Sequence, residues 1–231
     1  MLIFLDTETT GLEDVDKICS IGLVALQNEE LVKIYNLVND GKKISSKASS
    51  INHITNEMLK EKPKLQGSDA YKFLQKHNNE DSIIIAHNVK FDLNMLAKSG
   101  FQWHGELIDT LRCTKHLIQE CEQFSLQFLR YELKLYKLES QDSFAHNALS
   151  DALHVKLLYE YLLDMSTCRD MILLSKKNVL LQKFEFGKHS GRFIEDIAIN
   201  DRGYLEWMLA NILDLDEDLR YSVIYNLEGN Q

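Results

Sequence analysis

The sequence has little cysteine, and what it has is not arranged to bind a metal or to form a disulfide framework. Its four cysteines, Cys19, Cys113, Cys121 and Cys168, have no C-x-x-C spacing and no matching pair of histidines. This pattern is typical of reduced thiols in a protein core. It predicts a cytoplasmic protein.

Long hydrophobic runs are also missing. Apolar stretches such as residues 82–86 and 171–174 are far shorter than the roughly 20 residues that cross a bilayer. No basic leader precedes the apolar residues at the amino terminus, and acids begin at position 6. We therefore expect no membrane association, no secretion and no cleaved leader.

Basic residues are outnumbered. The chain has 26 Lys and Arg against 35 Asp and Glu, a net charge of -9. A protein that grips long duplex nucleic acid normally carries a basic excess, so that class is disfavoured. Basic groups at residues 42–47, 60–64 and 176–192 are each more typical of a solvated face than of phosphate contacts.

What the sequence does contain is three short stretches rich in acids, at residues 4–11, 87–92 and 146–151. The first is an apolar run that ends in Asp6 and Glu8. Residues i and i+2 of a strand share a face, so both carboxylates would point the same way from a strand end. Two such acids repel each other unless a cation lies between them, which favours a hard divalent metal. Taken alone, an Asp-x-Glu pair is more often a turn with solvated acids.

Together the three stretches resemble the motifs of the DEDDh (DnaQ-like) 3′-to-5′ exonuclease family, over roughly residues 1 to 165. The matching positions are Asp6 and Glu8 in the first motif, His87, Asn88, Phe91 and Asp92 in the second, and His146 and Asp151 in the third. Within the family, the resemblance is greatest to exonuclease X-like proteins and to the epsilon proofreading subunit of DNA polymerase III.

A shorter family feature, His-x-Ile-Thr followed by Met-Leu, falls at residues 52–59. Its histidine, His53, is displaced by one place, because the usual position corresponds to Asn52 or Ser50. Which of these side chains touches substrate is left open by the sequence.

The resemblance implies an RNase H-like fold and two divalent ions, Mg²⁺ or Mn²⁺. It implies that Asp6 bridges both ions, that Glu8 and Asp151 complete the first site, and that Asp92 holds the second ion largely through water. His146 would take the proton from the attacking water, a role that suits a side chain titrating near neutrality. These five residues are the expected catalytic set.

The resemblance also implies residues that contact substrate, namely Thr7, Thr9, Gly11, Leu12, His53, Ile54, Asn88 and Phe91. The substrate would be a single-stranded or frayed 3′ end of DNA, released as nucleoside 5′-monophosphates, in DNA repair or proofreading. Holding a few nucleotides requires only a small cationic channel, which the acidic chain can supply. A DNA polymerase or another replication or repair protein is the partner that this implies. RNA 3′-end trimming and a catalytically silent binding subunit are the alternatives.

The hydrophobic pattern predicts an α/β fold with a mixed sheet flanked by helices. Strands are expected at residues 2–6, 18–26, 30–38, 82–86 and 105–109, and helices at 68–77, 91–99, 111–119, 126–133 and 146–163. The serine-rich residues 44–54 are expected to be a loop. On the last helix, the expected apolar face consists of Leu149, Leu153, Leu157 and Tyr161.

Residues 1–166 are therefore expected to form an exonuclease domain and residues 167–231 a small α+β carboxy-terminal domain, with a hairpin at 179–194 followed by helices. The pattern at 186–191 and 204–207 resembles the carboxy-terminal domain of some exonuclease X-like proteins. One interpretation is a nucleic-acid grip formed by Phe186, Lys188, His189, Arg192 and the backbone N–H groups of two glycines. A stabilising or partner-binding appendage is the alternative. Trp207 on its own is more typical of a core residue than of a base-stacking one.

Overall fold

The computed structural model describes residues 1–27, 30–138, 147–184 and 186–229. The chain divides into two compact units, Met1–Ser175 and Lys176–Gln231. The sequence predicted a boundary between residues 166 and 167, just before helix α8 (Cys168–Lys176). Met171 of α8 is fully buried in the core of the first unit, which explains why that unit extends to Ser175.

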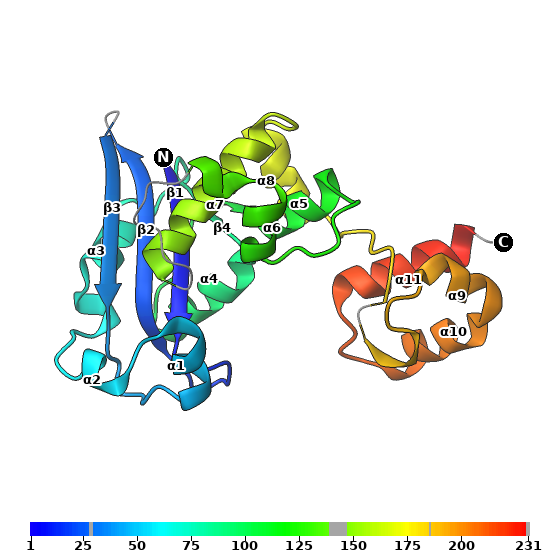
Figure 1. Ribbon diagram of the computed structural model, residues 1–231, viewed down its shortest axis with the longest axis horizontal. Coiled ribbons are helices and arrows are strands. Elements are labelled where there is room, and N and C mark those ends of the chain that lie inside the picture. Colours follow the sequence, from blue (N-terminus) through cyan, green and yellow to red (C-terminus); the bar gives the residue numbers. More distant parts are fainter. Residues whose placement is uncertain (28–29, 139–146, 185, 230–231) are drawn as a thin grey trace. The chain divides into compact units, whose positions relative to one another are not determined.

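The first unit is built on a five-stranded mixed sheet in the order β3-β2-β1-β4-β5 (Figure 1). Its strands are β1 (Leu2–Thr9), β2 (Ile18–Gln27), β3 (Glu30–Leu37), β4 (Ile83–Ala86) and β5 (Glu106–Asp109). Strands β1, β2 and β3 run antiparallel, whereas β4 and β5 continue parallel to β1. The sheet agrees with the mixed α/β sheet that the sequence predicted.

Helices cover both faces of this sheet. They are α1 (Ser46–Asn52), α2 (Asn56–Leu59), α3 (Asp69–Lys76), α4 (Val89–Lys98), α5 (Thr110–Leu117), α6 (Leu126–Glu132), α7 (Ala148–Leu163) and α8, with short 3-10 turns η1 (Leu65–Gly67) and η2 (Leu135–Leu138). Ile3 and Leu5 of β1 pack in one hydrophobic cluster with α3 and α4, and Phe4 packs in the other with α6, α7 and α8. In Figure 1, α7 crosses over β1 and β2, which it contacts.

The expectation of a loop at 44–54 was wrong over most of its length, because α1 lies there. Ser45 accepts a hydrogen bond from the backbone N–H of Ala48 at 3.1 Å and so caps the helix. The serines that indicated a loop therefore include the residue that starts a helix.

The second unit has its own hydrophobic core, centred on residues such as Phe184, Leu205 and Val223. It contains η3 (Gly187–His189), α9 (Ile194–Asn200), α10 (Arg202–Asn211) and α11 (Glu217–Gly229). The expected hairpin is reduced, in the described residues, to an isolated bridge between Lys183 and Phe193. The unit is therefore helical, not α+β as expected, because the turn at 187–189 winds into a helical turn after only one bridge.

Across the described parts of the chain, no helix combines the length and the hydrophobicity that a membrane crossing requires. All four cysteines are free thiols, with Cys19 and Cys113 buried and the other two half-buried.

Candidate metal and active site

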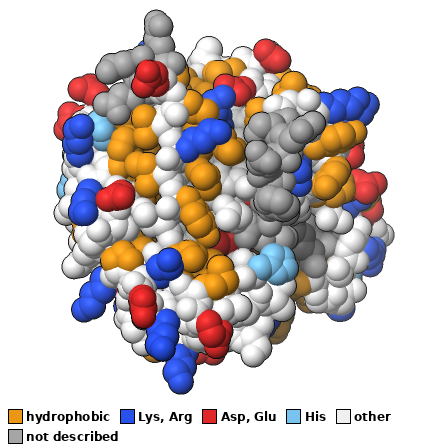
Figure 2. All heavy atoms as spheres, turned by 60° about the vertical axis from the view of Figure 1, so that its left-hand side comes forward, with side chains coloured by type: hydrophobic (Ala, Val, Ile, Leu, Met, Phe, Trp, Pro, Cys, Tyr) orange, Lys and Arg blue, Asp and Glu red, His pale blue; other side chains and the backbone are white. Residues whose placement is uncertain are grey.

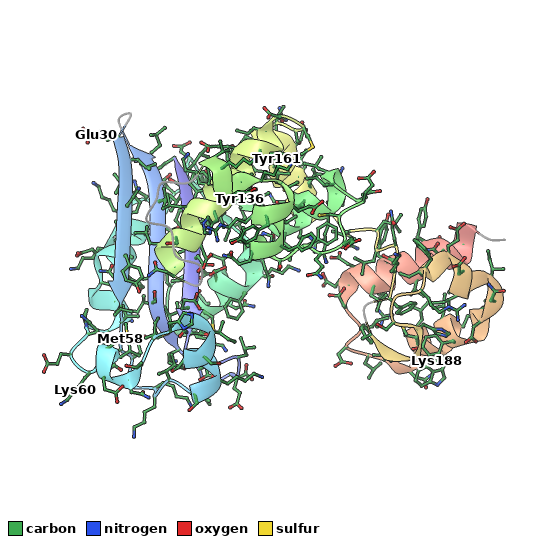
Figure 3. The ribbon with its side chains drawn as sticks, viewed as in Figure 1. Glu30, Met58, Lys60, Tyr136, Tyr161 and Lys188 are labelled. Atoms are coloured by element: carbon green, nitrogen blue, oxygen red, sulfur yellow. The ribbon has the colours of Figure 1, made fainter. Side chains whose placement is uncertain are left out.

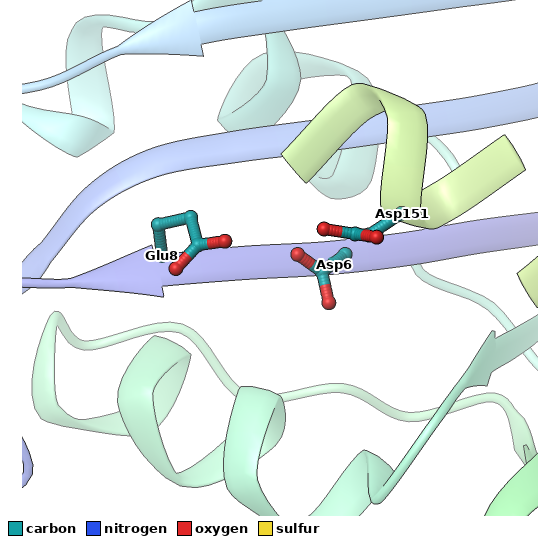
Figure 4. Close-up of side chains that lie close together, drawn as sticks. All are labelled: Asp6, Glu8 and Asp151. Carbon is teal, nitrogen blue, oxygen red and sulfur yellow. The ribbon is translucent and has the colours of Figure 1, made fainter. Parts of the chain in front are cut away.

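Strand β1 places two acids on the face of the sheet that α7 covers. Side chains alternate along a strand, so Asp6 and Glu8 share the face of Phe4, which packs in the α7-side cluster. Asp151, in the first turn of α7, lies over them (Figure 4). One carboxylate oxygen from each of these three acids lies within 4.8 Å of the others. The result is a compact group of oxygen donors.

A glycine allows α7 to approach the sheet this closely. Gly22 on β2 is the register partner of Asp6. A Cβ atom at position 22 would lie 2.2 Å from the backbone carbon and oxygen of Ala148. Asn147 caps α7 by accepting hydrogen bonds from backbone N–H groups of its first turn. The start of α7 is thereby fixed against β2, and Asp151 with it.

The fourth acid approaches from the other side of β1. Thr7 Oγ1 donates a hydrogen bond to Asp92 Oδ1 at 2.7 Å. Asp92 lies in the first turn of α4 and is only 3% exposed. Burial raises the pKa of Asp92 to about 7, although its hydrogen bonds with Thr7 act to lower it.

Two of the acids, Asp6 and Glu8, have pKa values that burial and the neighbouring acids raise. Burial raises the pKa of Asp6 well above its usual value, and the charges of Asp92, Asp151 and Glu8 raise it further. Burial also raises the pKa of Glu8 to about 8, with Asp151 and then Asp92 acting in the same direction and a hydrogen bond from Asn52 opposing them. A proton or a bound cation relieves this concentration of negative charge.

Asp151 is held by two side chains that no motif had indicated. Gln127 of α6 donates from Nε2 to Asp151 Oδ1 at 2.8 Å, and His154 Nδ1 lies 3.2 Å from the same oxygen. Arg130 donates to Oε1 of Gln127 at 3.3 Å, which orients the amide with its nitrogen toward Asp151. The i+3 spacing of His154 was readable from the sequence. Gln127 was not, because tertiary packing of two helices brings it to Asp151.

The sequence profile of the exonuclease family matches residues 3–159, which include all four acids. The chain belongs to the DEDDh (DnaQ-like) exonuclease family. A second profile, that of the exodeoxyribonuclease X-like carboxy-terminal region, matches residues 184–212 in the second unit.

Similarity to individual exonucleases and to a proofreading subunit supports this family assignment. The chain is 26% identical to exodeoxyribonuclease 10 of Escherichia coli strain K12 over 238 residues, which cover 99% of this chain and 100% of that protein. It is 27% identical to DNA polymerase III subunit epsilon of Buchnera aphidicola subsp. Schizaphis graminum, over 86% of this chain and 90% of that one. The structure of exonuclease X in complex with 5′ overhanging duplex DNA matches with a TM-score of 0.62 and 25% identity, over 76% of this chain and 99% of that one. The expected RNase H-like fold is thereby confirmed.

Membership of the family implies divalent metal ions, and the acidic cluster fits them. Each donor of the cluster is a carboxylate oxygen, the ligand type that Mg²⁺ and Mn²⁺ prefer. Burial and then the neighbouring acids raise the pKa values of Asp6 and Glu8, so a cation bound among these carboxylates would offset the cost of ionising them.

Three of the residues predicted to contact substrate lie at the end of β1 and in the loop that follows it. Thr9 Oγ1 donates to the carbonyl oxygen of Gly11 at 2.7 Å, and Thr10 Oγ1 donates to Asp16 Oδ1 at the same distance. Leu12 is 81% exposed. These hydrogen bonds hold the start of the loop in place. Leu12 faces solvent and lies four residues after Glu8 in the sequence.

The residues around the displaced histidine take unequal positions. His53 is exposed and ends α1 with a left-handed φ of 58°, whereas Ile54 is buried in a small hydrophobic cluster. Asn52 is buried, and its side chain donates to the carbonyl oxygen of Thr9 at 3.2 Å and hydrogen-bonds to Glu8. Asn52 thus contacts the site.

The second motif forms the turn from β4 into α4. His87 is held by its Nε2 atom, 2.7 Å from the carbonyl oxygen of Phe124. Asn88 has a left-handed φ of 71° and donates its backbone N–H to Asp109 Oδ1 at 3.0 Å. Phe91 is half-buried against the hydrophobic cluster on that side of the sheet. This turn places α4 so that Asp92 meets β1.

His146 lies outside the described residues. The nearest described residue is Asn147, the cap of α7. That helix begins at Ala148, two residues after the start that the sequence suggested. The catalytic role of His146 stays a prediction.

The four residues of the predicted nucleic-acid grip take two kinds of position in the second unit. Phe186 is 51% exposed, and Lys188 (labelled in Figure 3) is exposed with Nζ 2.8 Å from Asp201 Oδ2. His189 is buried, with Nε2 3.0 Å from Asp201 Oδ2 and Nδ1 3.3 Å from a guanidinium nitrogen of Arg192. His189 and Arg192 therefore help to hold the turn together, whereas Phe186 and Lys188 face solvent.

Proposed function

We propose that this protein is a metal-dependent 3′-to-5′ exonuclease that hydrolyses DNA from its 3′ end to nucleoside 5′-monophosphates, in DNA repair or proofreading. The observation that carries the proposal is the convergence of Asp6, Glu8 and Asp151 within 4.8 Å, with Asp92 in electrostatic contact with Asp6. A fold that was kept only for binding would gain nothing from forcing these charges together.

DNA is favoured over RNA by the relatives. The full-length relative from Escherichia coli is named an exodeoxyribonuclease, and the matching solved complex contains duplex DNA with a 5′ overhang. The charge distribution suits a short single-stranded end. On the face in Figure 2, the Lys and Arg side chains of the described residues are scattered among acidic and hydrophobic ones and form no continuous basic surface. Similarity to an epsilon subunit makes a DNA polymerase the partner to test.

In this proposal the chain's residues have distinct tasks. Asp6, Glu8 and Asp151 would hold one ion, and Asp92 would contribute to the second. When bound, such ions make a nucleophile from water at neutral pH and offset charge on the phosphate and the leaving oxygen. His146 would accept the proton of the attacking water. Thr7 keeps Asp92 beside β1, and Gln127 keeps Asp151 turned toward Asp6.

The test is a degradation assay on end-labelled single-stranded DNA, mismatched duplex DNA and RNA, with Mg²⁺ and with EDTA. We expect Mg²⁺-dependent release of mononucleotides from the 3′ end of DNA, and nearly complete loss of it in Asp6→Ala. The matched control is Asp69→Ala, an exposed acid of α3. Full activity in EDTA, or in Asp6→Ala, would refute the proposal, and faster degradation of RNA than of DNA would support the RNA-trimming alternative.

A further inference from the structure

The second unit exposes aromatic rings that its own core does not use. Phe186 and Trp207 are 51% and 53% exposed. Trp207 stacks on Tyr204, one turn earlier in α10, with centroids 6.2 Å apart and planes 26° apart. Phe186 meets the edge of Phe184, which is buried and also contacts Tyr204. The suggestion from sequence that Trp207 is a core residue was therefore wrong, because α10 packs Leu205 and Met208 inward instead.

Cations lie against these rings. Lys188 Nζ is 4.5 Å from the centroid of Tyr204, and Lys183 Nζ is 4.6 Å from that of Phe193, which is also exposed. Residues 183–193 carry three cations against one acid, in a chain whose net charge is -9. Exposed rings interleaved with cations are the chemistry by which proteins bind single-stranded nucleic acid without reading its sequence.

The turn that carries Lys188 is built rigidly. Gly187 has a left-handed φ of 71°, and Asp201 accepts hydrogen bonds from both Lys188 and the buried His189. The pKa of Asp201 is lowered, mainly by its hydrogen bond with Lys188. Lys188 and the ring of Tyr204 are thus fixed relative to each other before any ligand binds, which reduces the entropy cost of binding.

We propose that Phe186 and Trp207, with Lys183 and Lys188, form a binding surface for a single-stranded nucleic-acid segment. Bases stack on the two exposed rings, and the lysines contact phosphates. This inference rests on the proposed nuclease function in one respect: both assign nucleic acid as the ligand. The binding surface itself includes none of the four acids. This surface would bind one part of a nucleic-acid strand while the first unit hydrolyses the 3′ end of the same strand.

Fluorescence of Trp207, measured on the chain with both units present, tests this binding surface. The chain has two tryptophans, so Trp103→Phe leaves Trp207 as the single reporter. Titration in EDTA with an oligothymidylate prevents cleavage. We expect saturable quenching of Trp207, and in Phe186→Ala a dissociation constant raised by about fivefold or more, the usual effect of losing one stacked base. Lys188→Gln should reduce the salt slope of binding by about 0.7.

Tyr225→Ala is the matched control, because Tyr225 is an equally exposed ring (54%) on α11 outside this cluster, and it should leave binding unchanged. Trp207→Ala, followed by anisotropy of a labelled oligonucleotide, should weaken binding and Trp207→Phe should largely restore it, which separates stacking from damage to the fold. An absence of quenching, with equal affinity in Phe186→Ala and Tyr225→Ala, would overturn the proposal. Cleavage of a short oligonucleotide with Mg²⁺ is measured separately, so failure of this surface and failure of the nuclease assignment give different results.

Discussion

At the residue scale, the site depends on how each carboxylate is held as well as on which carboxylates are present. Asp151 Oδ1 is occupied by Gln127 and His154, and Asp92 Oδ1 by Thr7. Neighbours of this kind orient metal ligands, and their loss commonly costs about 10- to 100-fold in metal affinity.

Gln127→Ala should therefore weaken Mn²⁺ binding by about 10- to 100-fold while the protein remains folded. The change removes the donor that holds Asp151 but leaves every acid in place. Calorimetric titration of Mn²⁺ measures the effect, and Gln123→Ala, an exposed glutamine just before α6, is the control. Equal affinity in the two variants would mean that Gln127 has no part in placing Asp151.

His146→Ala should have the opposite profile. No metal bond is assigned to this side chain, so Mn²⁺ affinity should be retained, whereas single-turnover cleavage should slow by roughly 10² to 10⁴, the usual contribution of a positioned general base. The low-pH limb of the pH-rate profile should disappear with it. If the variant lost metal binding as fully as Asp151→Ala, or kept the wild-type rate and acid limb, His146 would not be the base.

The sequence indicated the acids of the site more readily than the residues that hold those acids in position. Asp6 and Glu8 could be paired from strand periodicity, whereas Asp92 and Asp151 were assigned from their resemblance to the motifs of the family. Gln127 could not be found, because its contact depends on how α6 packs against α7. In the sequence, Asn52 stood out only as a position where the family usually has a histidine. Its hydrogen bond with Glu8 depends on where α1 ends.

At the scale of elements, the contact between β2 and α7 decides whether the site exists. Gly22→Ala should displace the start of α7, because the new Cβ would lie 2.2 Å from the backbone of Ala148. We expect a loss of stability of roughly 1–3 kcal/mol, as for other overpacked positions, together with a large loss of metal binding. Chemical denaturation and Mn²⁺ titration measure the two effects.

Gly67→Ala is the comparison, because a Cβ there meets only Pro63 at 3.6 Å, an ordinary contact. A Gly22→Ala protein with the stability and metal affinity of Gly67→Ala would show that α7 is not fixed by this contact.

The predicted apolar face of α7 shows what periodicity cannot supply. Leu149, Leu153 and Leu157 are only partly buried and Tyr161 is exposed, whereas Val155 and Leu158 are fully buried. The sheet lies against one side of α7 and α5, α6 and η2 against others. A helix contacted on several sides has no single buried stripe for the sequence to reveal.

At the scale of the whole molecule, the acids make stability depend on pH. Glu8, with a pKa of about 8, and Asp6, whose pKa is raised by burial, keep protons in the folded protein that they release on unfolding. Between the ordinary pKa of Glu8, 4.5, and its folded value of about 8, the folded state binds more protons than the unfolded state. Without metal, stability should therefore fall as the pH rises across this range, by at most about 1.4 kcal/mol per pH unit for each proton. Glu8→Gln should flatten this slope.

Thermal melts in EDTA across this range provide the measurement, with the exposed Glu80→Gln as control for other titrating groups. Added Mg²⁺ should remove most of the pH dependence, because a bound cation replaces the protons. Stability that rises with pH in EDTA, or equal slopes in Glu8→Gln and Glu80→Gln, would contradict the electrostatic description of the site.

The sequence predicted the sheet of the first unit correctly but not the structure of the second unit. Five strands and the mixed sheet followed from periodicity, since each buried run was bounded by polar turns. The second unit was expected to contain a hairpin because Leu181, Phe184 and Phe186 alternate in the manner of a strand. Only one bridge forms in the described residues, and the core is made by α9, α10 and α11. Alternation over so short a segment does not specify a paired strand.

Binding of Mn²⁺ to the wild-type protein and to Asp6→Ala, followed by calorimetry without substrate, tests the central claim most directly. Asp6 is the acid on which the other three act, so its removal should abolish binding. In EDTA the variant should melt no lower than wild type, because an acid that is costly to bury, and that must either hold a proton or repel its neighbours, has gone. Asp69→Ala should behave as wild type. Wild-type Mn²⁺ affinity in Asp6→Ala would contradict the account, because the four acids would then not be a metal site.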